Sequence, residues 1–290
     1  MDKVLSLNQL IADRVREHPD LQILAIPDKN FNYTTYTTAE LDAAASLLAN
    51  YLRDTGALPG RAKGDATSRL TVGLLGVSNI DYVVTEMALY RMGYCVLFLS
   101  PNNSPPAIAH LLTITNASHI IVQDTLLPSA TTALTHLAVP SSVSIIHQPP
   151  SNVFGPDARF LLPVTIIHSS SSTGFPKPII ATNKAAVGNC IMNFNLTSLT
   201  TLPLYHVRLV HFLHDMMLNS HSTLLQGHGH SNLYRAWYAA TPLYLFPTGS
   251  IPLTSANIIK LLSQAQDIQA LYGVPFALKL LAETPEVSKS

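Results

Sequence analysis

The sequence predicts an α/β fold with mostly parallel sheets flanked by helices. A strand, a helix and a second strand follow one another between residues 70 and 100, which is typical of a right-handed βαβ unit. The same alternation then repeats over 105–124. Apolar residues make up 47% of the 290 residues and charged residues only 12%, so the chain can fill a large core.

Two helices are predicted before the first strand. Residues 1–20 read as an amphipathic helix with charges throughout, unlike a signal peptide. Residues 40–54, ELDAAASLLANYLRD, carry apolar positions at helical spacing, and Gly56 follows as a stop signal.

The repeated unit gives the next elements in order. The run LTVGLLGV at 70–77 is a short buried strand, and 79–92 fit a helix capped by Asn79 and ended by Gly93. Strand, helix and strand follow at 94–100, 105–116 and 119–124.

The pattern weakens after residue 124. Residues 125–160 are rich in Pro, Ser and Thr and are predicted to be a long surface connection. Strands are predicted at 165–168 and 178–182, with a helix from about residue 183.

Charge and cysteine usage exclude several classes. Lys and Arg together number 17, as do Asp and Glu, and no basic run occurs, which disfavours a nucleic-acid partner. The apolar region 70–99 is interrupted by Asp81, Glu86 and Arg91, so we expect no membrane span. Cys95 and Cys190 form no C-x-x-C motif. We therefore expect a soluble cytoplasmic protein.

The stretch HSSSSTGFPKPI at 168–179 raises two alternatives. It is either a Ser-rich linker or a loop whose hydroxyl and N–H groups donate to phosphate oxygens. A flexible linker is unfavourable between two core strands, which favours the interpretation as a phosphate-binding loop. It is not a Walker loop, because Lys177 comes three residues after Gly174 and a strand follows.

The run SSSSTGFPKP resembles the phosphate-loop signature of the adenylate-forming (AMP-binding) superfamily, and most of all the fungal aminoadipate-reductase-like, peptide-synthetase-like enzymes. Four further stretches resemble the family in the expected order: 30–56, 73–105, TTLPLYH at 200–206, and 252–283. The resemblance covers about residues 8–286 and implies the N-terminal part of the large domain of such an enzyme.

These enzymes activate a carboxylic acid with Mg-ATP as an acyl-adenylate. The resemblance implies that phosphates are held by Ser169, Ser170, Ser171, Ser172, Thr173, Gly174 and Lys177. It places His206, as the catalytic candidate, and His228 beside the acyl group. Gly273, Val274 and Pro275 would begin a wall of the substrate pocket. The cofactors implied are ATP and Mg²⁺, and the partners are a small carboxylic acid and a downstream carrier domain.

Two departures bear on activity. Ser171 stands where the family pattern has glycine, and at a positive φ a serine costs on the order of 1 kcal/mol. The adenine-binding segment, the ribose-binding acid and the C-terminal lid domain with its catalytic lysine have no counterpart within 1–290. We therefore interpret 1–290 as a truncated large domain with impaired activity. The alternative is a non-catalytic remnant that binds nucleotide weakly or not at all.

Residues 207–226 interrupt the family pattern, because deleting them would join PLYH to GHGHSNLYRAWY. The codons GTA-CGT for Val207-Arg208 and CAG for Gln226 would be the ends of a short intron, and Val287-Ser288 can be read in the same way. We predict retained intron sequence at both places. A genuine insertion is the alternative for 207–226, since its apolar positions suit a helix.

The histidines could form a metal site, and the aromatic residues could line a pocket. His211 and His214 stand at i, i+3 near His221, but no Cys or carboxylate completes a set, so no metal site is predicted. The other histidines, at 18, 110, 119, 136 and 147, are expected to be surface or capping residues. Tyr234, Trp237 and Tyr238 share one helical face, where core packing is favoured over a pocket role.

Overall fold

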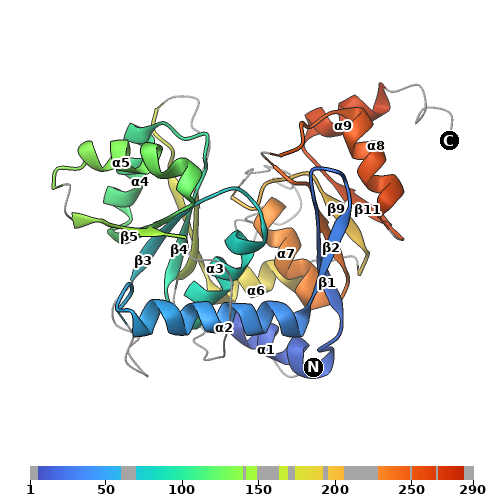
Figure 1. The fold of residues 1–290 in the computed structure, drawn as a ribbon, viewed down its shortest axis with the longest axis horizontal. Coiled ribbons are helices and arrows are strands. Elements are labelled where there is room, and N and C mark those ends of the chain that lie inside the picture. The colour runs from blue at the N-terminus through green and yellow to red at the C-terminus, as the bar shows by residue number, and fades with distance from the viewer. Residues whose placement is uncertain are drawn as a thin grey trace, which may run out of the picture.

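The computed structural model describes residues 6–59, 70–139, 142–148, 163–168, 174–191, 195–205, 228–248, 250–265 and 267–283. They form two mostly parallel sheets flanked by helices, as the sequence predicts (Figure 1). The first sheet has the strand order β6-β5-β3-β4-β7-β8. Its strands are β3 (Thr71–Leu75), β4 (Cys95–Leu99), β5 (Ala117–Val122), β6 (Ser144–His147), β7 (Pro163–His168) and β8 (Pro178–Thr182).

Helices α3 (Ile80–Arg91) and α4 (Pro105–Ile114) connect strands of this sheet in the predicted order. Helix α5 (Leu127–Thr135) precedes β6, and α6 (Asn183–Ile191) follows β8, where a helix from about residue 183 is predicted. The side chain of Asn79 accepts from the Tyr82 N–H at 2.9 Å, which confirms the predicted cap of α3. The four neighbouring pairs β3–β4, β3–β5, β4–β7 and β5–β6 are parallel, while β8 runs antiparallel to β7.

The predicted long connection over 125–160 is wrong for its first part. A short 3-10 turn at Asp124–Leu126, helix α5 and strand β6 all lie within or beside it. The helix buries only Ala130 and Ala133, and β6 is a four-residue edge strand, so neither produces a strong apolar periodicity. The rest of that range, 149–162, lies outside the described residues.

The second sheet has the strand order β11-β9-β10-β1-β2. Its strands are β1 (Gln22–Pro27), β2 (Tyr33–Thr37), β9 (Ser198–Thr200), β10 (Leu243–Leu245) and β11 (Ala270–Tyr272). Strands β1 and β2 form an antiparallel hairpin, and the neighbouring pairs from β1 to β11 are parallel.

The remaining helices are α1 (Leu7–Glu17), α2 (Thr38–Asp54), α7 (His228–Ala239), α8 (Ser255–Gln264) and α9 (Pro275–Ala282). The two N-terminal helices confirm the prediction. Ser6 caps α1, and Thr37 and Glu40 form a capping box on α2. Gly56 adopts φ +70° just after α2, which only glycine does without strain. In the part of the chain that the structure describes, no helix combines the length and apolarity that crossing a bilayer requires.

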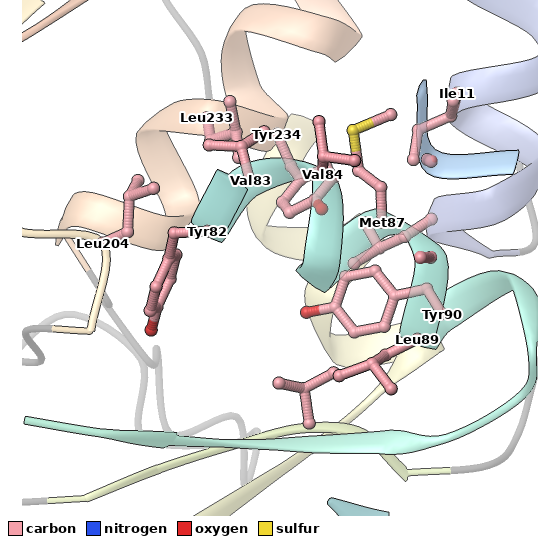
Figure 2. Close-up of a cluster of buried hydrophobic side chains, with 14 of the residues drawn as sticks. Ile11, Tyr82, Val83, Val84, Met87, Leu89, Tyr90, Leu204, Leu233 and Tyr234 are labelled. Carbon is pink, nitrogen blue, oxygen red and sulfur yellow. The ribbon is translucent and has the colours of Figure 1, made fainter. Parts of the chain in front are cut away.

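The main core lies where α1, α2, α3 and α7 meet. Figure 2 shows side chains of α3, among them Val84 and Met87, beside Leu233 and Tyr234 of α7 and Ile11 of α1. Trp237 and Tyr234 are fully buried in this cluster, and Tyr238 packs against it. The prediction that these aromatic residues belong to the core is therefore confirmed.

Two buried arginines fix the helices to one another. Arg91 of α3 contacts Asp42 and Ser46 of α2. Burial lowers the pKa of Arg91, while the negative charge of Asp42 opposes that effect. Arg14 of α1 donates to the main-chain oxygen of Trp237 at 2.7 Å, near the C-terminal end of α7. A cation at that end is favoured by the helix dipole.

Candidate functional site

The carboxyl ends of the parallel strands gather two sets of loops. In the first sheet, β3 and β4 are neighbours, but the chain passes from β4 back across β3 to β5. The direction of strand addition therefore reverses between β3 and β4. Open α/β sheets bind ligands in the crevice at such a reversal. The loops that follow these two strands, 76–79 and 100–104, lie there.

The serine-rich stretch joins β7 to β8 at this same edge. His168 is the last residue of β7 and pairs with Pro178, the first residue of β8. Gly174 and Lys177 are both exposed on the returning limb. The predicted phosphate ligands Ser169, Ser170, Ser171, Ser172 and Thr173 lie outside the described residues, so their roles remain predictions.

Both described flanks of this stretch contact the segment that follows β4. The side-chain nitrogen Nδ2 of Asn103 lies 3.0 Å from Nε2 of His168. The ring of His110 in α4 stacks on Phe175, with centroids 4.9 Å apart and an interplanar angle of 21°. Sequence reasoning gave neither Asn103 nor His110 a part in the site. For Asn103, the available signal was its place in the run SPNNS, which directly follows a buried strand of a parallel sheet.

The carboxyl ends of the second sheet surround a cavity of about 490 Å³. Thr201 follows β9, Phe246 follows β10, and Val274 follows β11, and all three line it. The remaining lining combines apolar side chains with three that carry a hydroxyl: Pro203, Tyr205, Thr248, Ser250, Ile251, Pro252 and Leu253.

This cavity contains part of the predicted substrate pocket. Of the three predicted wall residues, Val274 lines the cavity. Gly273 directly precedes Val274, and an added Cβ there would lie 3.0 Å from Oγ1 of Thr201, so a larger residue would require this side chain to move. Pro275 begins α9 and is exposed. The contributions from 246–253 were missed, because they come from a loop without a recognisable pattern.

His206 and the side chain of His228 lie outside the described residues. Their neighbours are described, however. Tyr205 is buried and lines the cavity. Gly229 in α7 packs so closely on the segment before it that a Cβ there would lie 2.0 Å from the main-chain oxygen of Pro203. The first turn of α7 therefore lies against the residues that lead to His206.

One hydrogen bond connects the two sets of loops. The main-chain N–H of Leu204 donates to Oγ of Ser78 at 2.8 Å, and both groups are buried. Ser78 belongs to the loop after β3 in the first sheet, whereas Leu204 precedes the cavity of the second. The two carboxyl edges are thus in direct contact.

A buried polar cluster lies between α3 and α7. Glu86 is fully buried, and its carboxylate Oε1 lies 2.7 Å from Nε2 of His230. The hydroxyl of Tyr90 lies 2.9 Å from the same nitrogen and 2.7 Å from Oγ1 of Thr165 in β7. The ring of Tyr234 packs on that of His230, with centroids 5.0 Å apart.

The tyrosines of this cluster stay protonated. Burial raises the pKa of Tyr90 and of Tyr234 well above the usual range, and the negative charge of Glu86 raises both further. They therefore remain neutral hydroxyls beside the carboxylate. Glu86 is visible in the sequence as a charge inside an apolar helix, but its partner 144 residues later is not.

Within the described ranges, no three His, Cys, Asp or Glu side chains are placed to share a metal ion. His211, His214 and His221 lie outside those ranges. The histidines expected to be surface or capping residues fit that description in three cases. His18 and His136 close the ends of α1 and α5, and the exposed His147 pairs with Asp124.

Comparisons with known proteins agree with this architecture. The chain is 30% identical over 197 residues to the adenylate-forming reductase stbB of Stachybotrys bisbyi, over 60% of this chain and 18% of that protein. It is 28% identical over 280 residues to the adenylate-forming reductase Nps10 of Heterobasidion annosum, over 88% of this chain and 24% of that protein. The chain thus spans less than a quarter of these relatives.

Solved structures share the fold. The N-terminal domain of FACL13 from Mycobacterium tuberculosis superposes with a TM-score of 0.74 at 15% identity, over 98% of this chain and 67% of that one. The o-succinylbenzoate CoA synthetase of Bacillus subtilis, solved with an acyl-adenylate intermediate, gives a TM-score of 0.70 at 17% identity, over 95% and 64%. The model of the AMP-binding enzyme family matches residues 11–289, and this chain belongs to that family.

Proposed function

We propose that this chain supplies the phosphate-binding and acyl-binding sides of a site that forms an acyl-adenylate from a carboxylic acid and Mg-ATP. The observation that carries the proposal is the contact between two carboxyl edges. The flanks of the serine-rich loop lie at the edge of the first sheet, and the cavity at the edge of the second. The Leu204–Ser78 hydrogen bond joins them.

The chemistry asks for charge neutralisation and positioning. The carboxylate attacks the α-phosphorus of ATP, the bond from that phosphorus to the bridging oxygen breaks, and pyrophosphate leaves with its electron pair. Ser169, Ser170, Ser171, Ser172, Thr173 and Gly174 would donate to the β- and γ-phosphates. Lys177, exposed at the returning limb, would add a positive charge there.

Magnesium would arrive on the phosphates of ATP. Mg²⁺ is commonly held through substrate phosphates with few protein ligands, which fits a hydroxyl-rich and lysine-bearing loop. When bound, the ion neutralises charge on the triphosphate.

The acyl group would occupy the 490 Å³ cavity. Val274 forms one wall, with Gly273 and Pro275 behind it, and His206 and His228 would lie by the carboxylate. We propose further that 1–290 is the N-terminal part of the large domain, that 207–226 is an insertion or retained intron, and that a carrier domain accepts the acyl group in full-length relatives.

The test is carboxylate-dependent exchange of pyrophosphate into ATP. It is run with the 290-residue chain, with a chain that lacks 207–226 and is extended with the downstream sequence, and with that repaired chain carrying Ser171→Gly. Activity that appears only in the repaired chain and rises with Ser171→Gly would support an adenylating site that is impaired in the 290-residue chain. No exchange in any form, together with no ATP binding by calorimetry, would favour the non-catalytic remnant.

Lys177 gives a matched pair of variants. Lys177→Ala should weaken Mg-ATP binding by about tenfold or more, because it removes a charge from a phosphate site. Lys184→Ala removes an equally exposed lysine from α6 and should leave binding unchanged. Equal binding by both variants would contradict the phosphate role of Lys177.

A further inference from the structure

A hydrogen bond from Asn103 holds the end of β7. Asn103 lies in a turn closed by its own N–H, which donates to the main-chain oxygen of Ser100 at 3.0 Å. From that turn its Nδ2 reaches Nε2 of His168 at 3.0 Å. Since an amide nitrogen donates, Nε2 of His168 accepts in this arrangement. His168 is buried and Asn103 is half-buried.

A ring contact holds Phe175, in the segment that leads into β8. Phe175 remains 51% exposed, which is unusual for a phenylalanine, and its ring stacks on His110. Phe175 lies next to the exposed Gly174, around which nothing is within 4 Å of an added Cβ. The stacked ring is therefore a fixed point in an otherwise open limb.

Both contacts originate on one rigid platform. Strand β4 is fully buried, and α4 buries one face through Ile108, Leu111 and Leu112. Asn103 immediately precedes the cap of α4, and His110 lies on that helix. The first and last described residues around the serine-rich loop, His168 and Gly174–Phe175, are thus held to the same support.

We infer that Asn103 and His110 are positioning residues for phosphate binding, which hold the two described flanks of the serine-rich stretch, His168 and Phe175, in place before phosphate arrives. Neither residue needs to touch the ligand. Flanks that are held in place in advance lose less conformational entropy on binding, and the affinity rises accordingly. This inference rests on the proposed phosphate role of the loop.

The experiment measures two properties of the 290-residue chain. The first is the affinity for inorganic tripolyphosphate with Mg²⁺, by calorimetry. The second is amide hydrogen exchange in peptides spanning 168–177, by mass spectrometry. The variants are Asn103→Ala and His110→Ala. The controls are Asn102→Ala, which truncates the exposed neighbour of Asn103, and His136→Ala, which removes a histidine from the end of another helix.

We expect Asn103→Ala and His110→Ala each to weaken tripolyphosphate binding by about threefold to tenfold, the range for one lost hydrogen bond or ring contact. Exchange in 168–177 should accelerate, with the unfolding midpoint unchanged. Phe175→Tyr keeps a stacking ring and should retain wild-type exchange, whereas Phe175→Ala should not.

The two proposals fail separately. If the wild-type chain does not bind tripolyphosphate, the phosphate role is wrong, and the exchange data alone still test whether Asn103 and His110 order the loop. If the wild-type chain binds and neither variant changes affinity or exchange, the positioning inference is overturned. A variant that lowers the unfolding midpoint and accelerates exchange in every peptide would also overturn it, because the effect would then be global.

Discussion

The six-stranded sheet takes its strands from residues 71–182, whereas the five-stranded sheet combines residues 22–37 with residues 198–272. In the first sheet, β3 and β4 are five-residue strands that are buried throughout. In the second, β9, β10 and β11 have three residues each, and β11 is half-buried along its length.

The two sheets differ in what they contribute to the molecule. Long buried strands with local helical crossovers form a rigid support for the serine-rich loop. Short strands that meet from distant parts of the chain shape the walls of the cavity, and their loops supply most of its lining. The two sheets are joined through the Leu204–Ser78 bond and through the helices α3 and α7.

The largest expected effect comes from the Glu86–His230 pair, which joins α3 of the first sheet to α7 of the second. His230→Leu leaves the buried carboxylate of Glu86 without its partner and should lower the free energy of unfolding by about 3–5 kcal/mol. The double variant Glu86→Leu, His230→Leu should recover most of that loss, because no uncompensated charge remains. Urea denaturation of both variants gives the values.

Asp54→Asn is the control for this cycle. It removes one partner of an exposed pair with Arg53, and should cost less than about 1 kcal/mol. If the double variant is less stable than the single one, the pair stabilises the junction through packing and hydrogen bonds rather than through charge compensation.

An intermediate loss of stability is expected from two leucine truncations that compare the two sheets directly. Leu97→Ala in β4 truncates a fully buried side chain and should cost about 3 kcal/mol. Leu271→Ala in β11 truncates a half-buried one and should cost about 1 kcal/mol. Chemical denaturation of the two variants side by side measures the difference. Equal losses would show that the second sheet is as tightly packed as the first.

The smallest effect is a pH dependence within the first sheet. Burial lowers the pKa of His119 in β5 below its usual 6.5, so the folded state favours the neutral ring. In the window just below pH 6.5 the unfolded state binds more protons, and stability from this group is complete above that pH and falls as the pH is lowered. The variant His119→Gln should show a shallower loss of stability on acidification than wild type. The slopes are compared by thermal unfolding between about pH 5 and pH 7. A slope in the variant equal to that of wild type would contradict the prediction.

Some residues of the candidate site could be predicted from the sequence, and others could not. Gly174 and Lys177 belong to a contiguous motif, so their grouping is visible in the sequence, and the structure places both on one exposed limb. Val274 was assigned to the pocket by resemblance, and it does line the cavity. Asn103 and His110 escaped notice because a ring contact and one amide bond leave no spacing pattern. His110 had been assigned a plain surface role.

The sequence by itself determined the α/β class, the order of strands and helices from 70 to 124, the two strands that flank the serine-rich stretch, and membership of a family, because βαβ units and contiguous loops are local in the chain. Only the tertiary structure decided which distant segments meet. The second sheet pairs β1 with β10, 219 residues apart at Leu24 and Leu243, and Glu86 finds His230 across the core. Such contacts arise from burial of apolar faces and of charge, which is a property of the whole packed chain rather than of any one stretch.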